Sequence, residues 1–240
     1  MFRKYIGDRA FYRKVIAITL PIIIQNGIAT FVSLLDNIMV GQIGTLQMSG
    51  VSIVNNLLFV FNLCVFGATS GAGIFTAQFH GSLNHAGIRH TFRFKVIAGA
   101  LICALGIGIF LWKGDFLIHI YLTGDGDAAD AAAILEYGRN YLMIMLLGLP
   151  AFAMSNAYAS TLRECGETTV PMIASISAVF TNLALNWVLI FGHLGMPAMG
   201  VQGAAIATAI SRYVEWGIVA LWTHLHSKAC LLYTSPSPRD

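Results

Sequence analysis

The sequence predicts an all-α membrane protein, built as a bundle of six transmembrane helices. Of its 240 residues, 57% are hydrophobic and only 10% are charged, against roughly 25% charged residues in soluble domains. The apolar residues gather in six runs of about 20 residues or more, a length that crosses the hydrocarbon core of a bilayer. The small net charge of +3 needs no nucleic-acid partner to explain it, and the lipid bilayer is the expected surrounding.

The chain begins with a basic segment at residues 1–14. Its five basic residues are Arg3, Lys4, Arg9, Arg13 and Lys14. No signal-peptide cleavage site ends the apolar run that follows, so we expect a cytoplasmic leader. The first span is predicted at 15–40, where Pro21 removes a backbone donor and is expected to kink the helix.

The second and third spans are predicted at 50–79 and 94–112. Small residues from Gly67 to Gly73 predict close packing of the second span against a neighbouring helix. The basic loop between these spans holds three histidines at spacings of five, which do not share one helical face. This spacing favours loop or interfacial histidines over a metal site; they are His80, His85 and His90.

Residues 113–136 form the only sizeable loop that the sequence predicts. Its four aspartates resemble a calcium loop only superficially, because the twelve-residue pattern with a terminal Glu is missing, and a solvated loop is favoured. The remaining spans are predicted at 137–162, 171–191 and 203–222. In the last of these, Arg212 and Glu215 lie three residues apart, which favours an ion pair that removes two charges from lipid over a substrate contact.

Lys and Arg residues are distributed unequally between the two sides of the predicted bundle. Ten lie on the side of the leader, Lys95 and Arg163 among them, and two, Lys113 and Arg139, lie on the other side. Since cytoplasmic loops carry the excess of basic residues, both ends are predicted to be cytoplasmic.

The last eleven residues, 230–240, differ in composition from the runs before them. They resemble the translation of a transposase adapter used in sequencing libraries. Eleven successive codons of that adapter encode these eleven residues in order. We expect a non-native tail, and a six-helix domain that covers 15–229. The three cysteines before the tail have neither metal-ligand nor disulfide spacing and are expected to be small buried hydrophobes; they are Cys64, Cys103 and Cys165.

Asp36 is a carboxylate inside the first apolar run. A charge in the middle of a membrane helix costs on the order of 2.5 to 3.5 kcal/mol on insertion scales, so such residues usually face a protein interior or a water-filled cavity and have a function. Asn182 and Asn186 in the fifth span are four residues apart and share one face, and Thr208 in the sixth span adds a hydroxyl. Helix rise permits these four side chains to meet in the outer half of the membrane without establishing that they do.

Three segments together resemble the amino-terminal half of the multidrug and toxic compound extrusion (MATE) transporters, in their NorM-like branch. They are Asp36-Asn37-Ile38-Met39-Val40-Gly41-Gln42-Ile43-Gly44, residues 162–172 (Leu-Arg-Glu-Cys-Gly-Glu-Thr-Thr-Val-Pro-Met) and residues 203–208 (Gly-Ala-Ala-Ile-Ala-Thr). The resemblance runs from about Tyr12 to Trp222. It implies one lobe of a twelve-helix fold, in which two six-helix lobes face each other across a central cavity.

This resemblance implies an antiporter of the bacterial cytoplasmic membrane, which exchanges inward-moving Na⁺ or H⁺ for an outgoing and often cationic, aromatic drug. It implies no cofactor beyond the transported ion, and a hinge at Pro21. The implied cation site is Asp36, Asn182, Asn186 and Thr208. Asn186 stands where some relatives carry a second acid, which leaves the choice between Na⁺ and H⁺ open.

The substrate cavity has three candidate residues: Gln25, Tyr141 and Met145. Tyr and Met residues of the fourth span can line an adaptable drug cavity, and roles in the core or at the membrane interface explain them equally well. The carboxy-terminal lobe of the family is missing, so we expect the chain alone not to transport.

Three other interpretations use different features of the chain. A lipid-linked oligosaccharide flippase of the same superfamily usually has several cavity Arg residues, and Arg212 is the only Arg well inside a predicted span. A membrane enzyme is disfavoured because paired catalytic carboxylates, HExxH and GxSxG are all lacking. A structural membrane subunit would use Asp36 only to pair helices, and ion-dependent drug efflux by the intact parent would distinguish a transporter from it.

Overall fold

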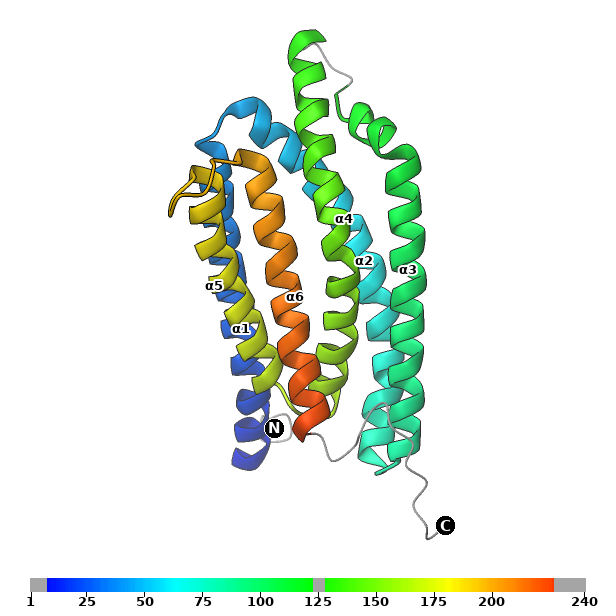
Figure 1. The fold of residues 1–240 in the computed structure, drawn as a ribbon. Coiled ribbons are helices and arrows are strands. Elements are labelled where there is room, and N and C mark those ends of the chain that lie inside the picture. The colour runs from blue at the N-terminus through cyan, green and yellow to red at the C-terminus, as the bar shows by residue number, and fades with distance from the viewer. Residues whose placement is uncertain (1–7, 123–127, 227–240) are drawn as a thin grey trace, which may run out of the picture.

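A computed structural model describes residues 8–122 and 128–226, which form six long helices (Figure 1). They are α1 (Arg9–Gly41), α2 (Thr45–Gly81), α3 (His85–Ile120), α4 (Ala128–Glu164), α5 (Thr169–Phe191) and α6 (Gly200–His226). Within these ranges there is no strand, and each helix is long and apolar enough to cross a membrane. The predicted all-α, six-helix fold is therefore confirmed. Arg3 and Lys4 of the predicted basic leader and the predicted tail at 230–240 lie outside the described residues, whereas Arg9, Arg13 and Lys14 belong to α1.

The helices extend well beyond the predicted spans, and the loops are correspondingly short. The prediction of a solvated loop at 113–136 is wrong for most of that segment, because α3 continues to Ile120 and α4 begins at Ala128. The basic histidine loop is also mostly helical, with a break only at 82–84. The predicted spans cover only the apolar part of each helix. A helix of 37 residues, such as α2 or α4, is about 55 Å long, whereas the hydrocarbon core is about 30 Å thick. Polar residues at both ends of a helix therefore lie outside the apolar core without leaving the helix.

Local chemistry accounts for several helix ends. The Asp8 carboxylate accepts a hydrogen bond from the backbone N–H of Phe11 at 2.7 Å and begins α1. The Asn84 side chain does the same for Gly87 at 2.9 Å and begins α3. Such caps satisfy backbone donors that the first turn of a helix leaves free. α5 ends at Gly192, whose φ of +74° is the left-handed conformation that glycine adopts readily.

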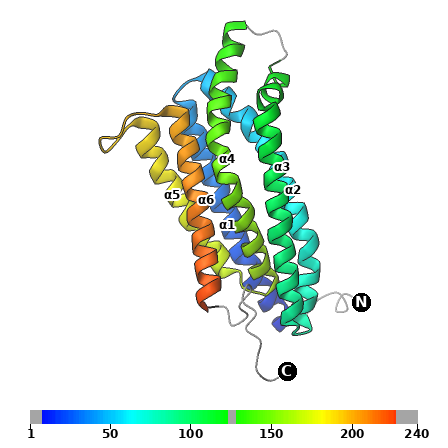
Figure 2. The ribbon, with the colours of Figure 1, turned by 45° about the vertical axis from the view of Figure 1, so that its right-hand side comes forward.

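The helices pack in two groups, α2–α4 and α1 with α5 and α6, and α6 joins the second group to the first. α2, α3 and α4 pack together, whereas α5 packs against α1 on one side and α6 on the other, and α6 also packs against α4 (Figures 1 and 2). The larger apolar core lies among α2, α3 and α4, and a smaller one joins the ends of α3, α4, α5 and α6. α1 is the least buried of the six helices, since α5 is its main neighbour.

Glycines determine two of the closest helix contacts. A Cβ atom at Gly50 would lie 2.9 Å from the backbone nitrogen of Gly138, so α2 and α4 can meet there only without a side chain. A Cβ at Gly203 would lie 2.7 Å from the backbone of Leu189, which brings α6 against α5 in the same way. The predicted packing surface at Gly67 and Gly71 is wrong for these two residues, because neither would meet another atom within 4 Å.

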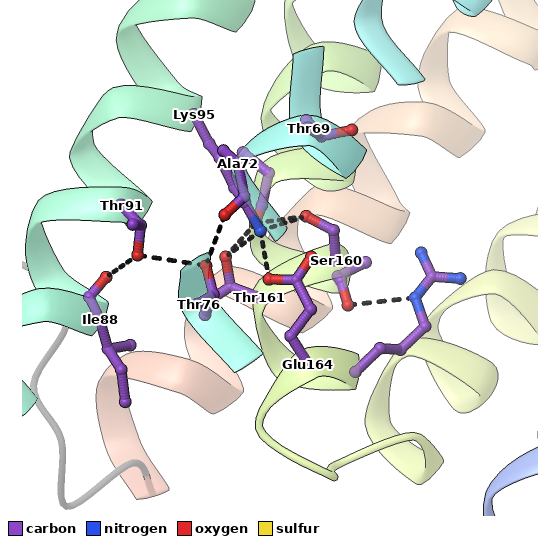
Figure 3. Close-up of polar contacts among 12 residues, drawn as sticks. Thr69, Ala72, Thr76, Ile88, Thr91, Lys95, Ser160, Thr161 and Glu164 are labelled. Carbon is purple, nitrogen blue, oxygen red and sulfur yellow. Dashed lines mark hydrogen bonds and ion pairs between the residues drawn. The ribbon is translucent and has the colours of Figure 1, made fainter. Parts of the chain in front are cut away.

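A buried polar cluster ties α2, α3 and α4 together near the end of the bundle at which α1 begins (Figure 3). Lys95 is completely buried; its ammonium forms an ion pair with Glu164 and donates to Ser160 Oγ at 3.2 Å and Thr161 Oγ1 at 3.3 Å. Lys95 lies inside α3, within the span predicted at 94–112, and its charge is buried in the bundle. A long Lys stem can pack in an apolar core when a carboxylate and hydroxyls receive its charged end.

Candidate functional site

The candidate site is centred on Asp36, whose side chain faces α5. Asn186 Nδ2 donates a hydrogen bond of 2.7 Å to Asp36 Oδ1, across 150 positions of sequence. This contact exists because α1 packs along α5. Asp36 is partly buried, and Asn186 is only 1% exposed. A short bond from an amide to a carboxylate is charge-assisted and stabilises the ionised carboxylate.

Asn182 lies one turn earlier on the same face of α5. With its amide oxygen toward Asp36, that oxygen accepts from Asn186 Nδ2 at 3.1 Å but also faces both carboxylate oxygens of Asp36, which are acceptors. With the amide turned, Nδ2 donates to Asp36 Oδ1 at 3.0 Å and Oδ2 at 2.9 Å, and Oδ1 accepts from the Thr208 hydroxyl at 3.1 Å. We assign the turned orientation, since amide oxygen and nitrogen are distinguished by their neighbours. Asp36, Asn182, Asn186 and Thr208 thus form one connected group.

The four side chains lie toward the end of the bundle at which α1 and α5 end and α6 begins. Asp36 is five residues before Gly41 and Asn186 five before Phe191, or about 8 Å from each helix end. Thr208 is eight residues into α6, about 12 Å from its start. The helix-rise argument permitted this meeting, and the packing of α1, α5 and α6 produces it.

The site offers a single carboxylate and several neutral oxygens. Asn186 Oδ1 is buried and has no hydrogen-bond partner, and a buried acceptor left unpaired costs about 1 to 3 kcal/mol. Carboxylate, amide and hydroxyl oxygens are ligands of hard cations, and a carboxylate also binds a proton. Across the described ranges, no group of three or more His, Cys, Asp and Glu side chains is placed to hold a metal ion. One carboxylate with neutral oxygens is a set of atoms that a monovalent cation or a proton can bind.

A cavity of about 440 Å³ opens beside Asp36, between α1, α2, α4 and α6. Two predicted substrate-cavity residues, Tyr141 and Met145, line it and are 5% and 2% exposed. Gln25 does not line it; this residue lies eleven positions before Asp36 on α1, about 16 Å away along the helix axis. Pro21 is one turn further away, inside α1.

Three asparagines of α2 line the same cavity, and the sequence analysis missed them. They are Asn55, Asn56 and Asn62. Asn55 accepts a hydrogen bond of 3.4 Å from the Tyr141 hydroxyl, which links α2 to α4. The available signal was the presence of polar amides in an apolar run, since intramembrane polar residues usually face a cavity or a protein interior.

Arg212 also lines the cavity, together with Asp36. The predicted ion pair between Arg212 and Glu215 is wrong: among the described residues, no ion pair within 4.0 Å involves either side chain. The Arg212 guanidinium lies 4.6 Å from the centre of the Phe152 ring instead, and its Nε is buried without a hydrogen-bond partner. Side chains three residues apart on a helix point about 60° apart. The Arg212 guanidinium can therefore lie against the Phe152 ring, to which a cation is attracted, and not against Glu215.

Comparison with known proteins gives one family and one architecture. The MatE family model matches residues 21–188. "Probable multidrug resistance protein NorM" of Thermotoga maritima is 29% identical over 211 residues, which cover 86% of this chain and 43% of the relative. "Multidrug resistance protein NorM" of Vibrio cholerae is 26% identical over 94% of this chain and 49% of its own length. The chain thus spans about half the length of the curated relatives that it matches.

Two solved structures share the arrangement of the helices. A eukaryotic MATE transporter, AtDTX14, superposes with a TM-score of 0.78 at 20% identity, over 94% of this chain and 48% of that one. A MOP superfamily transporter from Pyrococcus furiosus gives 0.73 at 22% identity, over 88% of this chain and 44% of that one. At these identities, the likeness is one of fold.

Proposed function

Because this chain belongs to the MatE family, we propose that it is the amino-terminal lobe of an antiporter that exports drugs or other toxic organic compounds in exchange for Na⁺ or H⁺. The chain is a multi-pass integral membrane protein. Its proposed setting is a cytoplasmic membrane of bacterial type, with both ends of the lobe cytoplasmic, as the excess of basic residues on one side favours. Its proposed partner is a carboxy-terminal lobe of the same transporter, which would close the cavity beside Asp36.

The observation that carries this proposal is the placement of Asp36. Its carboxylate borders an open cavity and is held by the Asn186 amide at 2.7 Å. In the proposed cycle, Asp36 binds the coupling ion and becomes neutral, then releases it and becomes an anion that attracts a cationic substrate. Loading can shift the transporter between conformations only if the two conformations bind the ion with different affinities.

The ligands proposed for the coupling ion are oxygen atoms of the four-residue group. A proton would reside on the Asp36 carboxylate. A sodium ion would use that carboxylate, the unpartnered Asn186 Oδ1 and the Thr208 hydroxyl. Since one carboxylate serves both ions, the site is compatible with either coupling ion.

The proposed substrate side of the cavity combines apolar and amide surfaces. Tyr141 and Met145 give an aromatic ring and a flexible thioether, which adapt to planar apolar drugs. The three asparagines of α2 add hydrogen-bonding groups to the lining, and Asn55 is bonded to the Tyr141 hydroxyl. Such a lining suits an aromatic cation that places its charge near Asp36.

Pro21 is the proposed hinge of α1. Proline removes one hydrogen bond of the helix, and α1 is the least buried helix of the bundle. Fifteen residues separate Pro21 from Asp36, about 22 Å of helix. A bend at Pro21 would therefore displace Asp36 relative to α5 while leaving the start of α1 in place.

The test is drug export by the full-length parent with Asp36→Asn. We expect loss of drug resistance and of ion-driven efflux from membrane vesicles, because the amide can neither bind a proton nor attract a cation. Asp115→Asn is the matched control, since Asp115 is an exposed carboxylate remote from the site. Survival of ion-driven efflux in the Asp36→Asn parent would overturn the proposal, and transport of a lipid-linked oligosaccharide by the unaltered parent would favour a flippase.

A further inference from the structure

A second, smaller cavity adjoins the candidate site. It measures about 250 Å³ and shares Asp36, Thr208 and Arg212 with the larger cavity. It also contains a carboxylate that the larger cavity lacks, that of Glu215. Two carboxylates on different helices, α1 and α6, thus border one cavity.

Glu215 lies deeper in the bundle than the candidate site. It follows Thr208 by seven residues on α6, about 10 Å toward the end at which α1 begins. In the proposed orientation this is the cytoplasmic direction. The Ser211 hydroxyl lines the cavity between the two levels and that of Ser175 lines it at Glu215, and the volume is enough for several water molecules.

The Glu215 carboxylate is hydrogen-bonded by Ser175 of α5 but forms no ion pair among the described residues. Arg212 on the same helix and Arg163 at the end of α4 attract it, yet among the described residues neither lies within ion-pair distance. Phe152 holds the Arg212 guanidinium through its ring. From α1 the titratable group in this cavity is Asp36, and α5 contributes none. An intramembrane carboxylate that borders a cavity and has no ion-pair partner is by default a functional residue.

We propose that Glu215 is the second carboxylate of the ion pathway, which receives the coupling ion from Asp36 and releases it toward the cytoplasm. This inference rests on the proposed function. For a proton, the O–H bond of the Asp36 carboxylic acid breaks and the proton passes through water and serine hydroxyls to a Glu215 carboxylate oxygen. Asp36 is then anionic and Glu215 neutral, until Glu215 gives the proton to cytoplasmic water. A sodium ion would move between the same two carboxylates without a change of protonation.

The experiment compares Glu215→Gln with the unaltered full-length parent in proteoliposomes, with an imposed H⁺ gradient in one arm and an Na⁺ gradient in the other. We expect drug binding within about twofold of the parent, because Glu215 does not line the larger cavity, in which the drug is proposed to bind. Efflux in the arm that drives the parent should fall about tenfold or more, because ion release lacks its acceptor. Glu215→Asp should restore most of the rate, and the pH profile of efflux should change in Glu215→Gln if the driving ion is H⁺.

Glu167→Gln is the matched control, because Glu167 lies in the loop after α4 and lines neither cavity. A Glu215→Gln parent that transports at the normal rate, with an unchanged pH profile, overturns the inference while Asp36→Asn still tests the proposed function. If Glu215→Gln fails to fold, as lost drug binding would show, a hydrophobic carbodiimide that modifies protonated carboxyl groups is applied to the unaltered parent. We expect the carbodiimide to modify Glu215 less in Asp36→Asn than in the unaltered parent. Modification of Glu215 that is independent of Asp36 contradicts proton transfer from Asp36 to Glu215.

Discussion

Removing the carboxylate of Glu164 should destabilise the bundle more than removing the Lys95 ammonium that it pairs with. The Lys95 side chain is 0% exposed and that of Glu164 is 17% exposed. In Glu164→Ala the ammonium therefore remains buried, with only the hydroxyls of Ser160 and Thr161 as acceptors. Breaking a buried pair in this way costs about 3 to 5 kcal/mol. In Lys95→Met the remaining carboxylate can reach solvent, and a smaller loss is expected.

The measurement is the thermal unfolding midpoint of the purified chain in detergent. At about 2 to 4 °C per kcal/mol for a chain of this length, Glu164→Ala should lower the midpoint by on the order of 10 °C. The double variant Lys95→Met with Glu164→Leu should recover most of this loss, because apolar residues of similar volume replace buried pairs at little cost. The control is Asp115→Asn, which breaks an exposed pair with Arg139 and should cost below about 1 kcal/mol. The reasoning is refuted if Lys95→Met is the more damaging variant, or if Glu164→Ala unfolds like the unaltered chain.

Three further outcomes follow from the geometry. Gly50→Leu should destabilise the chain by about 1 to 3 kcal/mol, because even its Cβ would lie 2.9 Å from the backbone of α4. A Cβ at Gly27 would meet no atom within 4 Å, so Gly27→Leu should unfold like the unaltered chain in the same detergent assay. Asn186→Ala should weaken ion dependence of efflux by about tenfold or more in the full-length parent, since it removes a charge-assisted bond worth about 1.5 to 3 kcal/mol; unchanged ion dependence would contradict this. Burial, and to a lesser degree the Glu164 carboxylate, raise the pKa of the Cys165 thiol. Maleimide labelling of Cys165 near neutral pH should therefore be slower than labelling of free cysteine, and it should accelerate as pH rises toward that pKa. Glu164→Gln should increase the labelling rate, and a rate insensitive to pH would refute the assignment.

The charge distribution of the cavity bears on substrate choice. Asp36 and Arg212 both line it, so an anion and a cation face the same space. The Arg212 charge is held at the Phe152 ring without a carboxylate at ion-pair distance among the described residues. Under the proposed function, a cationic substrate would be attracted to Asp36 and repelled by Arg212, which would orient it in the cavity.

The sequence was sufficient for features that depend on local composition and spacing. Six apolar runs predicted six membrane helices, because hydropathy requires no knowledge of tertiary contacts. The four-residue spacing of Asn182 and Asn186 placed both amides on one face of α5, since that face follows from helix geometry alone. The cost of a carboxylate in an apolar run made Asp36 the residue to examine.

The sequence was insufficient where a residue's role depends on its neighbour from another helix. Gly50 and Gly203 meet neighbouring backbones and Gly67 does not, although all three are glycines in apolar helices. Lys95 and Arg212 carry the same charge, but one pairs with a carboxylate and the other lies against an aromatic ring. Helix rotation and packing decide these partners, and they are not encoded in any short window of sequence.

Asp36 shows where the two contributions meet. Its position in an apolar run predicted an internal polar environment, because lipid cannot solvate a carboxylate. Which atoms provide that environment depended on α1 packing along α5, which brings Asn186 to 2.7 Å from a residue 150 positions away. The same packing placed Asp36 beside the cavity that also holds Glu215. Sequence alone thus identified a buried charge, and only the tertiary structure determined its partners, because contacts between distant segments form when whole helix faces pack together.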